Sequence, residues 1–283
     1  MSEFGFREGD RIRLEDEKGR MVSFTLKKGE TFHTHKGWIR HDDVLGLPEG
    51  SIVVTNSGMN YQAFTPLYSD FVLGMPRGAT IIYPKDAALI IGYGDIRSGQ
   101  KVIEAGAGSG ALSIAILKAL AGIGELRSYE AREDFSEIAT RNVLTFFGSH
   151  PTPWTIVNQR LEDEDQEALS NSDRFILDML APWEHVERAA QSLKPGGMLV
   201  VYVATTTQLS RTAEAIKADG RFSEPESFET LLRNWHHEGL AVRPVHSMNG
   251  HTGFLTFARR NAGTQLARRR RPAKGAYSED FSN

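Results

Sequence analysis

Lys101–Leu112, with the sequence KVIEAGAGSGAL, is the segment around which the rest of the chain is interpreted. It begins as the apolar end of a buried strand and continues into a turn with Gly106, Gly108 and Gly110. An apolar helix is expected from Ala111. Glycine suits such a turn because the backbone angles penalise side chains and because a ligand must approach the main chain closely. The unpaired N–H groups at the start of the helix offer a site to a carboxylate or phosphate.

The spacing of the glycines separates two kinds of nucleotide site. A dinucleotide-binding turn has the pattern G-x-G-x-x-G. Residues 104–110 instead have E-x-G-x-G-x-G, which resembles motif I of the S-adenosylmethionine (SAM) methyltransferases. Glu130 ends the next predicted strand, close to the ~20 residues at which a ribose-binding carboxylate is expected. The alternative, a helix-capping turn with an unrelated surface glutamate, is weaker because both signals occur together.

The composition is that of an ordinary globular protein. The chain has 283 residues, 40% of them apolar and 24% charged, which suggests about two domains. It contains no cysteine, so disulfides and thiolate metal sites are excluded. The N-terminus lacks the apolar region of a signal peptide, and no apolar run approaches the ~20 residues of a membrane span. We therefore expect a soluble, cytoplasmic protein with no membrane contact.

Two histidine pairs raise the question of a metal site. His33 and His35 can share one face of a strand, and His236 is followed directly by His237. No third ligand is evident beside either pair, so we expect structural or surface histidines and no metal.

The charge distribution bears on a nucleic-acid partner. A formal net charge of −3 argues weakly against one, because phosphate contacts favour a basic surface. We expect residues 261–283 to form a disordered tail. Basic residues cluster in and just before this tail: Arg259, Arg260, Arg268, Arg269, Arg270, Arg271 and Lys274.

Residues 1–75 predict a small N-terminal all-β domain with a barrel-like form. Arg11–Leu14 and Val22–Leu26 alternate between apolar and polar residues, as half-buried strands do. Ser51–Phe64 predicts a hairpin around a Ser-Gly turn, and glycines punctuate the whole segment at strand-like intervals.

Residues 76–260 predict the catalytic domain. Strands and helices alternate there, which indicates a Rossmann-like parallel sheet covered by helices on both faces. Ligands of such sheets bind at the carboxyl ends of the strands. Near the C-terminal end, Glu224–Asn234 predicts a helix, and Leu240–Pro244 with Gly253–Phe257 predict a closing antiparallel hairpin. The expected parallel strands are Lys101–Glu104, Glu125–Glu130, Thr155–Asn158, Arg174–Asp178 and Met198–Ala204.

Asp178–Glu184, with the sequence DMLAPWE, follows an apolar strand at the expected ligand edge. It resembles the Asp/Asn-Pro-Pro-aromatic motif of methyltransferases that act on base amino groups, although it is longer and lacks paired prolines. Asp178 is placed to accept a hydrogen bond from an adenine amino group, and Trp183 or Tyr83 to stack on a base. A turn-capping Asp178 and a core Trp183 are the alternatives, and for Trp183 both interpretations stay open.

Five segments together resemble the TrmI family of tRNA (adenine-N1)-methyltransferases, especially its actinobacterial members. The resemblance covers nearly the whole chain. It implies a Rossmann-like SAM-dependent methyltransferase domain with a small N-terminal all-β domain. It also implies a homotetramer that methylates adenosine 58 in the tRNA T-loop. The segments are YPKDAA, EAGAGSGAL, DMLAPWE, YVATTTQLSR and RPVHSMNGHTGFL.

The resemblance also implies the site residues. The glycine turn holds the methionine part of SAM, Glu130 the ribose and Arg160–Leu161 the adenine. Asp178 and Tyr83 are the implied catalytic residues against the substrate base, with Tyr202 as a weaker candidate. The implied cofactor-binding residues are Glu104, Gly106, Ala107, Gly108, Ser109, Gly110, Ala111, Leu112, Glu130, Arg160, Leu161 and Asp178.

One position departs from the family pattern. Relatives often have an aspartate where this chain has Arg160, and that carboxylate is available to the amino group of the SAM adenine. Either the backbone or Glu162 replaces the contact, or the contact is absent.

Two other functions remain open at this point. A SAM methyltransferase of protein carboxylates or small molecules needs neither a base pocket nor a β domain. A non-catalytic tRNA-binding subunit is expected to lose the cofactor turn, which this chain keeps.

Overall fold

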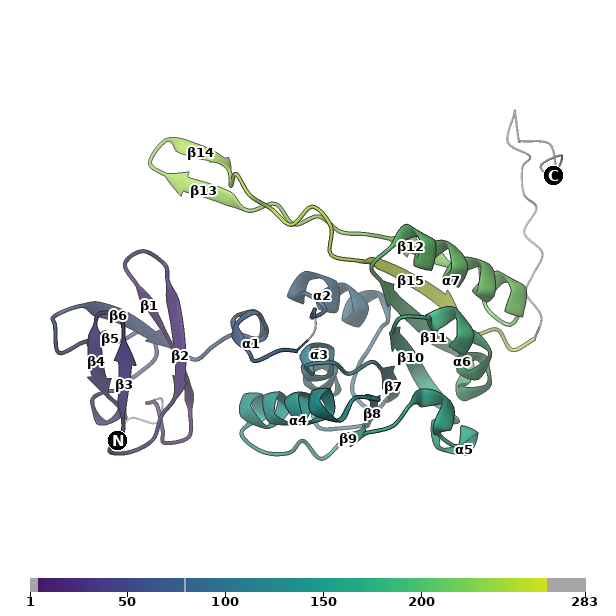
Figure 1. Ribbon diagram of the computed structural model, residues 1–283, viewed down its shortest axis with the longest axis horizontal. Helices are drawn as coiled ribbons and strands as arrows, with labels where there is room; N and C mark the ends of the chain where they lie inside the picture. The colour runs from purple at the N-terminus through teal and green to yellow at the C-terminus, as the bar shows by residue number, and fades with distance from the viewer. Residues whose placement is uncertain (1–4, 79, 264–283) are drawn as a thin grey trace.

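The computed structural model describes residues 5–78 and 80–263 as two regions joined by helix α1 (Tyr68–Gly74) (Figure 1). An all-β region precedes this helix, and a larger α/β region follows it. A β-hairpin projects from the α/β region on a long stalk that is formed by the two segments flanking the hairpin (Figure 1). No helix among the described residues is both long and apolar enough to cross a bilayer.

The all-β region consists of a four-stranded antiparallel sheet, β2-β1-β6-β5, and the separate hairpin β3-β4. Along β1, Ile12 and Leu14 are buried while the residues between them are partly exposed, because successive side chains point to opposite faces. The predicted strands of this region are confirmed. Their bounds are β1 (Arg11–Asp16), β2 (Met21–Thr25), β3 (Thr31–Thr34), β4 (Gly37–Arg40), β5 (Ile52–Val54) and β6 (Asn60–Phe64).

The α/β region is built on a seven-stranded sheet with the order β12-β15-β11-β10-β7-β8-β9. The five strands from β11 to β9 are parallel, and β15 and β12 are antiparallel additions at one side. This arrangement confirms the predicted fold class. The strands are β7 (Lys101–Ala105), β8 (Glu125–Tyr129), β9 (Trp154–Val157), β10 (Ser172–Asp178), β11 (Leu193–Val203), β12 (Glu226–Phe228) and β15 (Phe254–Arg259).

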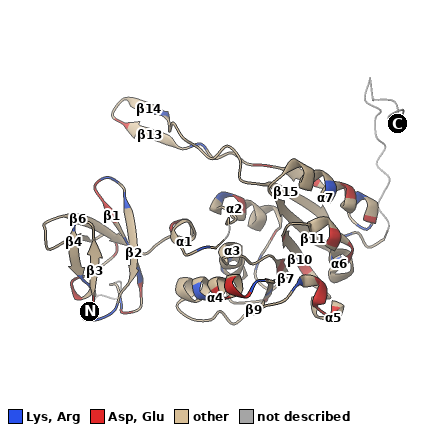
Figure 2. Cartoon of the chain, in the orientation of Figure 1, with Lys and Arg blue, Asp and Glu red and all other residues tan. Residues whose placement is uncertain are grey.

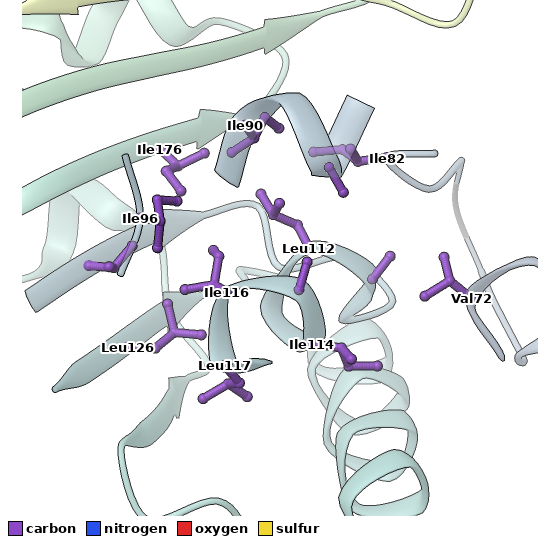
Figure 3. Close-up of a cluster of buried hydrophobic side chains, with 14 of the residues drawn as sticks. Val72, Ile82, Ile90, Ile96, Leu112, Ile114, Ile116, Leu117, Leu126 and Ile176 are labelled. Atoms are coloured by element: carbon purple, nitrogen blue, oxygen red, sulfur yellow. The ribbon is translucent and has the colours of Figure 1, made fainter. Parts of the chain in front are cut away.

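Helices cover both faces of this sheet. Ile176 faces the core under α2 and α3, together with Leu112 and Ile116 (Figure 3). Its neighbour Leu177 faces the opposite core, under α6 and α7, because adjacent strand residues alternate between faces. The helices are α2 (Pro84–Tyr93), α3 (Ala111–Leu120), α4 (Glu133–Phe147), α5 (Gln166–Leu169), α6 (Val186–Ser192) and α7 (Thr206–Asp219), with 3₁₀ turns η1 (His41–Asp43), η2 (Leu161–Asp163) and η3 (Pro182–His185).

Helix α1 packs on the α/β region and anchors the all-β region to it. Phe71 and Val72 are buried in the same core as α2 and α3. Arg13 of β1 donates to Asp70 at 2.6 Å, and the Arg11 guanidinium lies 5.2 Å from the centre of the Phe71 ring. The division of the chain at residues 75 and 260 stays a prediction. The predicted tail, apart from residues 261–263, lies outside the described residues.

The helix predicted at Glu224–Asn234 is wrong. Residues 226–228 form strand β12, which pairs with β15. The Phe228 ring stacks on Phe257 at 5.5 Å, and Ser227 Oγ lies 2.9 Å from Thr256 Oγ1. These contacts with a distant strand outweigh the helical preference of the acidic segment. No local sequence pattern reveals such contacts.

The closing hairpin predicted from Leu240–Pro244 and Gly253–Phe257 is also wrong in its pairing. Strand β15 lies between β11 and β12, whereas β14 (Ala241–Pro244) pairs with β13 (Trp235–Glu238). The β13–β14 hairpin projects from the body, and most of it has the colour of uncharged residues (Figures 1 and 2). Strands with similar patterns offer no sequence information about which partner they take.

Candidate active site

The three glycines of the turn after β7 have different surroundings. A Cβ atom at Gly106 would lie 1.8 Å from the carbonyl oxygen of Asp178 on the neighbouring strand. At Gly110, which has φ +82° and precedes α3, a Cβ would lie 3.2 Å from Ala139 of α4. Only Gly108 opens towards free space, since its nearest neighbour would be 4.0 Å away. Close protein packing therefore explains two glycines, and Gly108 leaves open the space that an approaching ligand would need.

Glu104 lies beneath the turn and is completely buried. Its Oε2 accepts hydrogen bonds from Ser113 Oγ at 2.7 Å and Ser128 Oγ at 2.5 Å, while Oε1 has no partner. Burial raises the pKa of this carboxyl to about 7, although both serine hydroxyls oppose the shift. Glu104 thus links β7 to α3 and β8 by hydrogen bonds on the buried side of the turn.

Glu130 follows β8 and has its carboxylate fixed on the other side of the turn. Oε2 accepts from the backbone N–H of Gly108 at 2.9 Å, and Oε1 accepts from the N–H and Nε of Arg132 at 3.1 and 3.0 Å. Asn158 Nδ2 donates to the Glu130 carbonyl at 2.9 Å. Because a carboxylate has about two acceptor positions on each oxygen, Oε1 is fully used, and Oε2 can still accept one ligand hydroxyl.

Asp178 ends β10 at the same edge. Its side chain is half-buried, and within the described residues no side chain or backbone N–H donates a hydrogen bond to its carboxylate. Burial raises the pKa of Asp178 to about 7, and the negative charges of Glu104 and Glu130 add to the shift. Tyr202 on β11 is its neighbour in the sheet register. The group is therefore a carboxyl prepared to accept a hydrogen bond from a ligand.

A cavity of about 690 Å³ lies along this edge of the sheet. Of the predicted site residues, Gly106, Gly108, Glu130, Arg160, Leu161 and Asp178 line it. The other predicted cofactor residues lie behind this lining. These are Glu104, Ala107, Ser109, Gly110, Ala111 and Leu112, all buried or part of the turn. Their assignment to the cofactor stays a prediction.

Tyr83 lies at a second cavity, of about 420 Å³, and not at the first. It immediately precedes α2, whose first residue is Pro84. Thr252 lines both cavities, so the two are adjacent. Tyr202, the weaker candidate, lines the first cavity together with Asp178. The predicted catalytic residues Tyr83 and Asp178 are therefore divided between the two cavities.

A polar network of hydrogen bonds surrounds Thr252, the residue that lines both cavities. Lys85 Nζ donates to Asp86 Oδ1 at 2.6 Å, to the Thr230 carbonyl at 2.7 Å and to Thr252 Oγ1 at 2.7 Å. Thr252 Oγ1 donates to Asp86 Oδ2 at 2.7 Å, and its carbonyl accepts from the Tyr202 hydroxyl at 2.8 Å. The network joins α2, the base of the hairpin stalk and β11.

Some residues of the cavity were not predicted. His185 follows the DMLAPWE segment directly and could have been found from that position. Gln208 belongs to α7, a helix that was not predicted although Thr205 and Gln208 form its capping box. Its Nε2 donates to the Leu180 carbonyl at 2.9 Å. Trp183 does not line the cavity; Arg211 of α7 lies 5.2 Å from its ring centre, which favours a packing position.

The residues present suit SAM. The cavity is large enough for a nucleoside-sized ligand, its wall includes the open face of Gly108, and Glu130 offers a fixed carboxylate beside it. No cluster of three potential metal ligands occurs among the residues that the structure describes. The fold and the edge of the sheet define a SAM-dependent methyltransferase.

Comparisons with known proteins agree with this class and narrow it. A SAM-dependent O-methyltransferase of Thermotoga maritima superposes with a TM-score of 0.82 at 30% identity, covering 95% of this chain and 97% of that one. Residues 5–53 match the TrmI-like N-terminal family, and residues 64–242 match the family described as tRNA methyltransferase complex GCD14 subunit. The chain belongs to the TrmI family of tRNA methyltransferases.

Two relatives illustrate the match. The tRNA (adenine(58)-N(1))-methyltransferase TrmI of Thermus thermophilus is 34% identical over 254 residues, which are 88% of this chain and 96% of the relative. The tRNA (adenine(57)-N(1)/adenine(58)-N(1))-methyltransferase TrmI of Methanocaldococcus jannaschii is 30% identical, over 87% of this chain and 93% of the relative. The similarity therefore extends through both regions of the molecule.

Proposed function

We propose that this chain is a tRNA (adenine(58)-N(1))-methyltransferase that methylates N1 of an adenosine in the tRNA T-loop. Family membership supports this proposal together with one structural observation. The Asp178 carboxyl lines the first cavity together with Gly106 and Gly108 of the turn, and it has no hydrogen-bond donor of its own among the described residues. The exocyclic amino group of adenine is the donor that it lacks.

The chemistry needs alignment more than proton removal. SAM supplies an electrophilic methyl group, and adenine N1 already has a lone pair. Methylation leaves positive charge on the purine, so ionised Asp178, hydrogen-bonded to the amino group, would stabilise that charge as it develops. Tyr83 would lie against the base and restrict its orientation. A base in a folded RNA must first be extruded, at a cost of roughly a few kcal/mol.

We also propose that the chain acts as a homotetramer in the cytoplasm. The projecting hairpin and its stalk expose large apolar side chains that a monomer leaves in water, and exposed patches of this kind mark protein interfaces. Pooling subunits would provide more basic surface to bind tRNA phosphates and offset base extrusion. A tRNA substrate and a chain without cysteine both fit the cytoplasm. The exposed side chains are Leu231, Leu232, Trp235, Leu240 and Val242.

The direct test is methyl transfer from labelled SAM to unmodified tRNA, followed by nucleoside analysis. We expect 1-methyladenosine as the product. Substitution of adenosine 58 should abolish labelling, and substitution of adenosine 57 as a control should leave it unchanged. Labelling that is lost only when adenosine 57 is replaced would contradict the proposed position.

The Thermotoga neighbour favours a second candidate, methylation of an oxygen atom in a smaller substrate. The same labelled assay separates the two functions. Label that resists RNase and is released by mild base would indicate a methyl ester and would replace the tRNA proposal.

A further inference from the structure

One carboxylate of the first cavity is not used by the proposed reaction. Glu162 follows β9 and lines the cavity beside Arg160 and His185. Its Oε1 accepts from both Nε and Nη2 of Arg160 at 2.5 Å. Its Oε2 lies 3.9 Å from His185 Nε2, beyond hydrogen-bond length, and within the described chain no other residue donates to it. Arg160 therefore holds one oxygen, and no other residue of the described chain donates to the second.

The charges around Glu162 keep this acceptor ionised. Hydrogen bonds from its own backbone N–H and from Arg160 lower the pKa of Glu162. Burial lowers the pKa of His185, so its ring is neutral near pH 7 and does not neutralise the carboxylate. Oε2 is therefore an acceptor on a charged carboxylate, and no cation of the described chain forms a hydrogen bond with it.

The position of Glu162 matches the base end of the bound nucleoside. The glycine turn follows β7, Glu130 follows β8, and Glu162 follows β9, and these three strands are neighbours in that order. Adjacent strands lie about 4.8 Å apart. A ligand with its methionine end at the turn and its ribose at Glu130 would therefore extend its base towards residues 160–162.

We propose that Glu162 Oε2 accepts a hydrogen bond from the exocyclic amino group of the SAM adenine, and that Arg160 is a positioning residue that holds Glu162 in place. The proposal rests on the cofactor site described above. It explains how an arginine occupies this part of the site, because a guanidinium cannot itself accept from an amino group. A base with a carbonyl in place of the amine would bind less well, because its oxygen and the carboxylate are both hydrogen-bond acceptors.

The test is ligand preference, measured by calorimetry without turnover. The two ligands are S-adenosylhomocysteine and its analogue with purine in place of adenine, which lacks only the amino group. The wild-type protein should bind the adenine form about 10- to 100-fold more tightly, as expected for one hydrogen bond to a charged group. Glu162→Ala should remove this preference. Asp163→Ala, an exposed neighbour that does not line the cavity, is the matched control and should retain it.

Two outcomes for Glu162→Ala would overturn the proposal. An unchanged preference would assign the amino group to the backbone or to no contact. An equal loss of affinity for both ligands would mean that Glu162 only supports the shape of the site. Unaltered thermal unfolding of the variant excludes misfolding as the cause of either result.

The positioning function of Arg160 is tested by combining an Arg160 variant with the Glu162 variant. Arg160→Met should lower the preference for the amino group partly, and it should have no further effect when Glu162 is already alanine. Independent, additive losses would show that Arg160 contacts the ligand itself and would contradict its positioning function. Because these assays use no tRNA, a failure of the proposed RNA substrate leaves their outcome unaffected.

Discussion

The cofactor side and the acceptor side of the cavity differ in how their carboxylates are held. On the cofactor side, Glu130 has both oxygens hydrogen-bonded, and Glu104 is fixed by two serines. On the acceptor side, the Asp178 carboxyl has no donor among the described residues. The first arrangement is preorganised by the protein alone, whereas the second is completed by a substrate.

The two sides also differ in the origin of their support. The donors to the Glu104 and Glu130 carboxylates lie within residues 108–132, which are close in sequence. The acceptor side depends on the network of Lys85, Asp86 and Thr252, in which Thr252 lies more than 160 residues from the other two. The acceptor side should therefore be disturbed by substitutions in distant segments without any change in cofactor affinity.

Removing Asp86 should have the largest effect on this contrast. Asp86→Ala leaves the buried Lys85 ammonium without its ion pair, so the free energy of unfolding should fall by about 3–5 kcal/mol. Methyl transfer should fall as well, with the affinity for S-adenosylhomocysteine retained at temperatures where the variant is folded. Chemical denaturation and calorimetry measure the two quantities.

Asp43→Ala serves as the control for Asp86, because it breaks the exposed Arg40–Asp43 pair and should leave the free energy of unfolding nearly unchanged. A parallel loss of cofactor affinity in Asp86→Ala would show that the two sides are not independent.

Removing the Asp178 carboxylate should affect the reaction and not the cofactor. Asp178→Ala should lower the rate of tRNA methylation by about 10²–10³-fold, the usual cost of losing one charge-stabilising group. Single-turnover kinetics give the rate, and calorimetry with S-adenosylhomocysteine gives the affinity. An equal loss in both measurements would place Asp178 on the cofactor side.

Gly106 lies where the two sides meet. Gly106→Ala introduces a Cβ 1.8 Å from the Asp178 carbonyl at φ +94°, so overpacking and backbone strain should together cost about 2–4 kcal/mol. Both cofactor affinity and methylation should fall. Gly122→Ala is the control, since φ is +79° there but no atom lies within 4 Å, and about 1 kcal/mol of strain is expected. Equal destabilisation by the two changes would exclude the steric contact as the cause.

The pH dependence tests the acceptor side without changing any residue. With a pKa of about 7, Asp178 must lose its proton to accept from the amino group, so kcat/KM should fall tenfold per unit below pH 7 and level off above it. Because the pKa of Asp178 in the folded protein lies above the unfolded value of 3.8, its contribution to the free energy of unfolding declines as pH rises from about 4 to 7. Asp178→Asn should remove that decline, as pH-dependent denaturation would show. An identical decline in the variant would assign it to Glu104.

Much of the site could be predicted because its signals are local. The glycine turn and the acidic residues that end β7, β8 and β10 each lie in a short segment with a clear strand pattern. Alternation of strands and helices then places the strand ends at one edge by topology alone. The catalytic roles of Tyr83 and Asp178 stay predictions, and the sequence contains no measure of the two separate cavities that they line.

The failures lie in the C-terminal part, where pairing is decided at long range. The acidic segment that contains β12 has the composition of a helix start, yet Phe228 packs against Phe257 and the segment extends a sheet. The polar network at Thr252 was not predicted for the same reason, since a threonine gives no sign that a buried lysine and aspartate lie beside it.

The sequence by itself determined the fold class, the family, the cofactor turn and the carboxylates at the strand ends, because these depend on short-range patterns and on the chemistry of single residues. Only the tertiary structure decided which glycines contact the protein and which opens to free space, which donors each carboxylate has, and which strands β15 joins. These properties depend on distances of a few ångströms between segments far apart in the chain. Local preference carries no information about such distances.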